Sequence, residues 1–109
     1  MSTLIVVPDA RGDGAPRQAV QTRVLQNDDH TRVVQFQFEA ERGLAEHQAP
    51  FPITMYLARG EASIRTGEES HDASEGFWAY VPAGMPHAVT AKTGATLLVT
   101  MFKGAAPKP

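Results

Sequence analysis

The chain has 109 residues, of which 42% are hydrophobic and 20% are charged, and its formal net charge is −2. This length suits one domain, and the composition is that of a globular chain and not of a disordered one. The ten Lys and Arg residues are scattered singly, so no basic stripe is available to hold a nucleic acid. The absence of cysteine excludes disulfide scaffolds, thiol catalysis and cysteine metal sites. No apolar run is long enough for a signal peptide or a membrane span, so we expect a cytoplasmic protein with no membrane partner.

The first 18 residues are expected to form an N-terminal arm. Residues 4–7 are apolar and strand-like, and a loop rich in Gly and Pro separates them from the rest of the chain. We expect this short segment to pair with a sheet edge, in its own chain or in a second protomer. Edge pairing across a two-fold axis would produce a homodimer.

The first two strands are predicted on either side of a turn at residues 27–30. Residues 19–25 are rich in Val and Thr, which favour strands. Residues 31–40 alternate between apolar and polar side chains, with Gln35 and Gln37 on the polar side. This period of two predicts a half-buried strand.

The later segments are short, apolar and bounded by Gly or Pro. The predicted strands are residues 53–59, 61–65, 77–81, 87–91 and 96–102. Hairpin turns are expected at residues 66–69 and 92–95, and a flexible tail at 104–109. No segment of ten or more residues has a helical pattern, and strands spaced by roughly 8–12 residues indicate an all-β sandwich or barrel.

Residues 76–87 form the most specific motif of the chain. Gly76 and Gly84 mark tight turns, and the second turn directs His87 toward the enclosed side of the sheet. The spacing Gly-x5-Pro-x-Gly-x2-His, with Pro82 as its proline, resembles the second motif of the cupin superfamily.

The first cupin motif aligns less completely with this sequence. His47 matches its first histidine and Gly60 its closing glycine, whereas Ala49 and Ile53 occupy the positions of its second histidine and its glutamate. The resemblance implies a single-domain cupin-like antiparallel β-barrel, or double-stranded jelly roll, with its barrel at about residues 19–103. It also implies a homodimer.

The same resemblance implies a divalent metal, such as Fe, Ni, Mn or Zn, in the mouth of the barrel. Of the four usual ligand positions only His47 and His87 remain, and they are the two candidate metal ligands. Non-haem iron also requires a carboxylate, and structural zinc requires four protein ligands. The third and fourth ligands are not placed by the sequence.

Three hypotheses about function follow. The first is a small-molecule-binding cupin, with His47 and His87 as polar contacts and an apolar wall from Met55, Trp78 and Tyr80. The second is a metal-dependent cupin enzyme of the dioxygenase or isomerase type. The third is a non-catalytic oligomerising β-barrel module. The sequence does not name the ligand or decide whether the protein is an enzyme.

Overall fold

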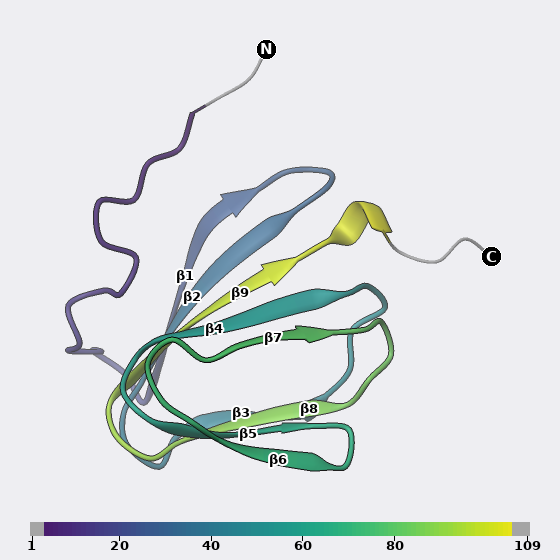
Figure 1. Ribbon diagram of the computed structural model, residues 1–109. Coiled ribbons are helices and arrows are strands. Elements are labelled where there is room, and N and C mark those ends of the chain that lie inside the picture. The colour runs from purple at the N-terminus through teal and green to yellow at the C-terminus, as the bar shows by residue number, and fades with distance from the viewer. Residues whose placement is uncertain (1–3, 106–109) are drawn as a thin grey trace.

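The computed structural model describes residues 4–105 as two facing antiparallel sheets (Figure 1). The chain forms nine strands in this described part and then one 3-10 turn, and no helix in it is long and apolar enough to cross a membrane. The elements are β1 (Val20–Asn27), β2 (Arg32–Phe38), β3 (Gly43–His47), β4 (Ile53–Arg59), β5 (Ala62–Thr66), β6 (Glu69–Ala73), β7 (Trp78–Val81), β8 (His87–Ala91), β9 (Ala95–Met101) and η1 (Lys103–Ala105).

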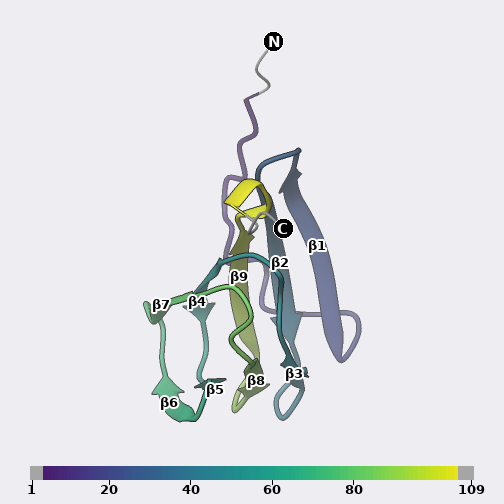
Figure 2. The ribbon, with the colours of Figure 1, turned by 90° about the vertical axis from the view of Figure 1, so that its right-hand side faces the viewer.

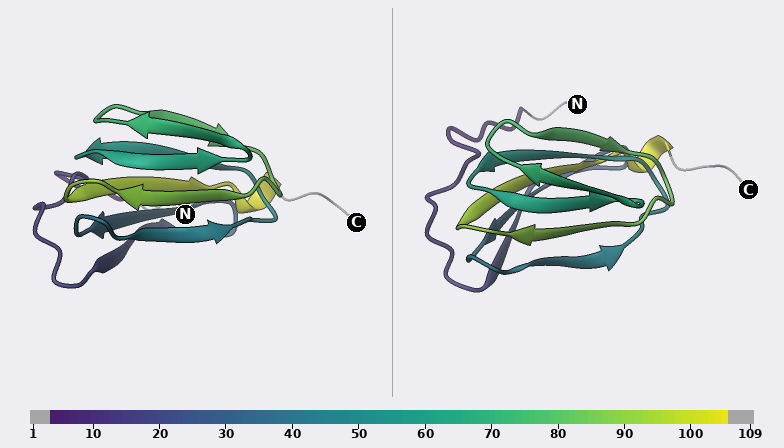
Figure 3. Two further views of the ribbon diagram at one scale, coloured as in Figure 1. Left: turned by 90° about the horizontal axis from the view of Figure 1, so that it is seen from below. Right: turned by 60° about the horizontal axis from the view of Figure 1, so that its bottom comes forward.

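The strand order confirms the all-β jelly-roll prediction. The larger sheet has the order β1-β2-β9-β4-β7, and the smaller sheet has the order β3-β8-β5-β6. From β2 onward, every connection passes to the opposite sheet except the β5–β6 hairpin. The two sheets lie face to face and enclose one core (Figures 2 and 3).

The sequence prediction located seven of these strands, with small shifts at their ends, and missed β3 and β6. Both missed strands are five residues long and carry charged and small side chains. They are strands because they pair with β8 and β5, respectively. Tertiary pairing therefore outweighs a weak local preference for β-structure at these segments.

The two predicted hairpin turns have different outcomes. The turn at residues 66–69 is confirmed, because it joins the paired strands β5 and β6 and contains Gly67 at φ +62°. The prediction at residues 92–95 is wrong, because this segment carries the chain from β8 in one sheet to β9 in the other. In the predicted tail, Gly104 lies in η1 and its N–H donates to the His30 carbonyl, while residues 106–109 lie outside the described residues.

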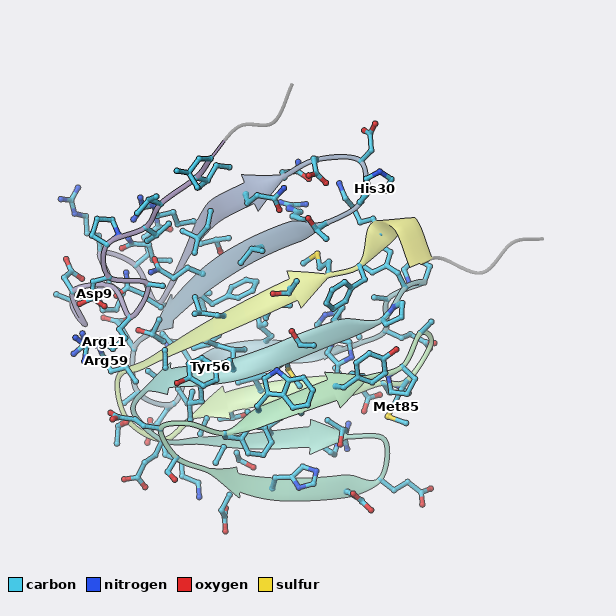
Figure 4. All side chains as sticks on the ribbon, turned by 45° about the horizontal axis from the view of Figure 1, so that its top comes forward. Asp9, Arg11, His30, Tyr56, Arg59 and Met85 are labelled. Atoms are coloured by element: carbon cyan, nitrogen blue, oxygen red, sulfur yellow. The ribbon has the colours of Figure 1, made fainter. Side chains whose placement is uncertain are left out.

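The N-terminal arm covers part of the outer face of the larger sheet. The Gln35 side chain donates a hydrogen bond to the Ala10 carbonyl at 2.9 Å, and the Gly14 N–H donates to the Gln37 side chain at 3.2 Å. The prediction of a half-buried β2 is therefore wrong, because both glutamines are buried beneath the arm. Arg59 also donates to the Gly12 carbonyl, at 2.8 Å. Figure 4 shows Asp9 and Arg11 of the arm beside this arginine.

The start of the arm is not a strand. Residues 4–7 pair with no sheet edge of the described chain, although they are the most apolar part of the arm. Pairing of this segment within its own chain is therefore not observed. Its pairing with a second protomer stays a prediction.

Candidate functional site

The candidate site is a cavity of about 140 Å³ between the two sheets. Its wall is almost wholly aliphatic and aromatic, and the polar side chains among its lining residues are two histidines. The lining residues are Phe36, Leu44, His47, Ala49, Phe51, Ile53, Met55, His87, Val89, Val99 and Met101. The cavity therefore combines an apolar interior with one pair of imidazoles, the combination expected of a small-molecule site.

Strand pairing brings the two histidines together across the smaller sheet. His47 ends β3, His87 begins β8, and the two residues are direct partners in the ladder. They are 40 positions apart in the sequence, and only this long-range pairing makes them neighbours. His87 is buried, at 3% exposed, and His47 is exposed at the rim.

The turn before β8 sets the position of His87. The Met85 N–H donates to the Pro82 carbonyl at 3.2 Å, and Gly84 has φ +80°, as a type II turn requires. The Gly84 N–H donates to the Ala49 carbonyl at 2.8 Å, which ties this turn to the β3–β4 loop. Met85 marks the turn in Figure 4. The glycine and proline spacing of the sequence motif thus corresponds to a real turn that positions the histidine.

The two imidazoles contact each other edge to face. Their Nε2 atoms are 3.1 Å apart, and their ring centroids are 4.3 Å apart. The Nδ1 atom of His47 lies 2.9 Å from the Ala45 carbonyl oxygen, and that of His87 lies 3.0 Å from the Met85 carbonyl oxygen. Carbonyl oxygens only accept hydrogen bonds, so both Nδ1 atoms are donors in these contacts. With a hydrogen on Nδ1 of each neutral ring, both Nε2 atoms are unprotonated acceptors.

Burial favours the uncharged form of His87. Removal of the ring from water lowers its pKa below the ordinary value, and the positive charge that His47 can carry lowers it further. The hydrogen bond to the Met85 carbonyl acts in the opposite direction and offsets part of this shift. His87 is therefore neutral at neutral pH.

The residues present do not fit the four-ligand metal shell that the cupin resemblance implies. Ala49 and Ile53 line the cavity at two of the four expected positions, and neither side chain has an atom that can bind a metal. Within residues 4–105, no three His, Asp or Glu side chains are grouped to hold an ion. Two imidazoles alone are a poor chelate for a divalent cation.

Of the five side chains that the sequence predicted for the site, three line the cavity and two do not. Met55 lines the cavity with the two histidines. Trp78 and Tyr80 are 60% and 54% exposed and do not line it. Side chains alternate along a strand, so on β7 Trp78 and Tyr80 share the outer face, while Val81, the next residue, is buried in the core.

Several cavity residues were not singled out from the sequence. They are Leu44, Val89 and Val99, which come from three different strands. Alternation along β8 identifies Val89 as inward-facing once the direction of His87 is known, because the two residues are two positions apart on that strand. Leu44 lies on β3, which was not recognised as a strand. Phe51 lies half-buried at the cavity in the β3–β4 loop.

Solved structures share this architecture over most of the chain. An RmlC-like cupin from Shewanella frigidimarina NCIMB 400 superposes with a TM-score of 0.79 at 16% identity, covering 94% of this chain and 92% of that chain. This protein has the cupin fold. A second cupin superfamily protein, from Desulfitobacterium hafniense DCB-2, superposes with a TM-score of 0.76 at 22% identity, covering 81% of each chain.

The cupin fold of this chain also resembles part of a larger enzyme. Salicylate 1,2-dioxygenase from Pseudoaminobacter salicylatoxidans, solved in complex with gentisate, matches with a TM-score of 0.70 at 14% identity, covering 77% of this chain and 25% of that chain. No protein-family model and no curated protein sequence matches the chain. At these identities the likeness establishes the fold, and the function has to be argued from the site.

Proposed function

We propose that this cupin binds a small, largely apolar molecule in the cavity between its sheets. The observation that carries the proposal is an apolar cavity of about 140 Å³ with His47 and His87 among its lining residues. An engineered cavity of about 150 Å³ with aliphatic and aromatic walls stays dry and binds benzene. A ligand the size of one five- or six-membered ring therefore suits this space, with the histidines as its polar contacts and Met55 in its apolar wall.

The β3–β4 loop is the proposed route into the cavity. Ala49 and Phe51 lie in this loop and line the cavity, and Phe51 is half-buried. A rotation of the Phe51 side chain would open the space to solvent without disturbing a strand. Ligand binding would then restore contacts that the cavity wall lacks when it is empty.

A matched pair of variants tests this function. Ala49→Leu places a larger side chain in the cavity, whereas Ala15→Leu makes the same change at an exposed position of the arm. Benzene titrated into 15N-labelled protein is expected to shift the amide signals around the cavity in the wild type and in Ala15→Leu. Ala49→Leu is expected to weaken binding at least about tenfold, which corresponds to about 1.4 kcal/mol. Equal binding by all three proteins would contradict the proposed site.

A metal-dependent enzyme of the dioxygenase or isomerase type is the second candidate. One observation favours it: metal-bound histidines commonly donate their other ring N–H to a carbonyl oxygen, as both Nδ1 atoms do here. The missing ligands at Ala49 and Ile53 count against it. Metal analysis after expression with Fe, Ni, Mn and Zn decides the question, and we expect less than about 0.2 equivalents of bound metal.

We also propose that the protein forms a homodimer. The outer face of β4 and β7 carries an outer aromatic patch, made of Tyr56, Trp78 and Tyr80, in which Tyr56 is the ladder partner of Trp78. The start of the arm runs away from the sheets (Figure 1) and exposes Leu4 and Val6. A second copy of the chain supplies the complementary surface for both features, because each copy carries an exposed apolar segment and an exposed aromatic surface.

A further inference from the structure

The histidine pair makes three contacts in series. They join the Ala45 carbonyl to Nδ1 of His47 at 2.9 Å, Nε2 of His47 to Nε2 of His87 at 3.1 Å, and Nδ1 of His87 to the Met85 carbonyl at 3.0 Å. Each contact has the length of a hydrogen bond and needs one hydrogen. Two neutral imidazoles carry one N–H each, so the pair has two hydrogens for three contacts.

No choice of tautomer removes this deficit. With both hydrogens on Nδ1, the two Nε2 lone pairs face each other. Moving one hydrogen to Nε2 makes the contact between the rings, but it leaves an Nδ1 lone pair against a carbonyl oxygen, which cannot donate. The first arrangement keeps both hydrogen bonds to the backbone, and it leaves two acceptor atoms on side chains that line the cavity.

We propose that the cavity ligand is a small apolar alcohol or phenol, whose O–H donates a hydrogen bond to an unprotonated Nε2 atom of the His47–His87 pair. This inference rests on the proposed function and names the chemical class of its ligand. A ketone or an ether of the same size offers only an acceptor and finds no donor in the cavity. A carboxylate would place its negative charge against two lone pairs.

The surroundings of the pair support a neutral, accepting site. Among the described cavity-lining residues, only the two histidines titrate. On β5, the ladder neighbour of His87 is Thr66, whose hydroxyl contacts His71 Nε2 at 3.2 Å on β6. The nearby ion pair of Glu46 and Arg65 is exposed to solvent.

The test compares cyclopentanol with cyclopentanone, which have the same ring and differ in the ability to donate. Binding to metal-free protein in EDTA at pH 7.5 is measured by calorimetry and by NMR titration. We expect cyclopentanol to bind at least about tenfold more tightly than cyclopentanone, because the ketone cannot donate a hydrogen bond to the buried His87 ring. Cyclobutanecarboxylate, as the anionic probe, is expected to bind more weakly than either.

A double variant with a matched control tests whether the two histidines cause the preference for the alcohol over the ketone. His47→Leu with His87→Leu is expected to bring the affinity ratio of alcohol to ketone to about one or below, while His30→Leu, on the exposed β1–β2 turn, keeps the wild-type ratio. If the double variant does not fold, the comparison of the two probes on the wild type decides the inference by itself.

The other outcomes are distinguishable. Equal affinities for alcohol and ketone overturn the inference and leave the proposed cavity function intact. Tighter binding of the carboxylate overturns it, because the pair then holds a third proton itself. Binding of a probe that is seen without EDTA and disappears in EDTA overturns it in favour of a metal. Binding of no probe overturns the proposed function together with the inference.

Discussion

The inner and outer faces of β4 and β7 carry different side chains from the same eleven residues of strand. The inner face has Ile53, Met55 and Val81, all of which are buried in the core. The outer face has Tyr56 and Trp78, which are exposed; Tyr56 projects from β4 in Figure 4. The larger aromatic rings, which resemble the wall of a pocket in composition, lie on the side without a cavity.

The difference teaches that residue type alone does not locate a site on a strand. Side chains alternate between the faces, so one known direction fixes all the others on that strand. On the inner face, smaller aliphatic side chains leave a space beside His47 and His87. On the outer face, Tyr56, Trp78 and Tyr80 are exposed to solvent.

The largest expected effect is a difference in stability between two variants at adjacent residues of β4, one on each face. Met55→Ala removes a side chain that is 1% exposed and is expected to lower the free energy of unfolding by about 2–5 kcal/mol. Tyr56→Ala, on the outer face, is expected to lower it by no more than about 1 kcal/mol. Urea unfolding of the two variants measures the difference. Equal losses would show that the two faces are not distinct in packing.

The next effect concerns the outer face alone. Changing both Trp78 and Tyr80 to Ser is expected to weaken dimerisation at least about tenfold, because interface energy concentrates in buried aromatic side chains. Light scattering across micromolar concentrations measures the assembly. Leu4→Ser with Val6→Ser is expected to act in the same direction. If the wild type is a monomer at these concentrations, the homodimer proposal is wrong. Benzene binding by the variants is expected to be unchanged, because the substituted residues do not line the cavity.

The smallest expected effect is the pH dependence of stability. The folded protein lowers the pKa of His87, whereas the unfolded chain has the ordinary value near 6.5, so the unfolded state takes up this proton first as the pH falls. The contribution of this pKa shift to the free energy of unfolding is complete above about pH 6.5. It is lost as the pH falls from there through the lower pKa of His87 in the folded state. His87→Asn should remove this part of the slope, which amounts to at most about 1.4 kcal/mol per pH unit. Parallel unfolding curves for variant and wild type between pH 5 and 7 would contradict it.

Alternation and turn residues predicted an all-β sandwich or barrel, and the resemblance to the cupin motifs implied the jelly-roll arrangement. The sequence predicted the turn that places His87 because Gly84 occupies a position of positive φ, where glycine is the favoured residue. The resemblance also implied that His47 and His87 lie together in the mouth of the barrel, and their Nε2 atoms are 3.1 Å apart.

The remaining features depend on contacts between distant segments. Gln35 and Gln37 resemble solvent-facing residues, yet the arm that buries them lies more than twenty positions earlier. The strand β3 forms because β8 pairs with it. Local sequence patterns therefore did not predict that Leu44, on β3, lines the cavity. The outward direction of Trp78 follows from the ladder between β4 and β7, which fixes the faces of both strands.

The most direct measurement of the central claim is an isotope-edited NOE experiment with unlabelled cyclopentanol bound to 13C-labelled protein. The account predicts NOEs from the ligand to the Met55 methyl group and to the His87 ring, both of which line the cavity. NOEs only to the rings of Tyr56 and Trp78 would place the ligand on the outer face and contradict the account.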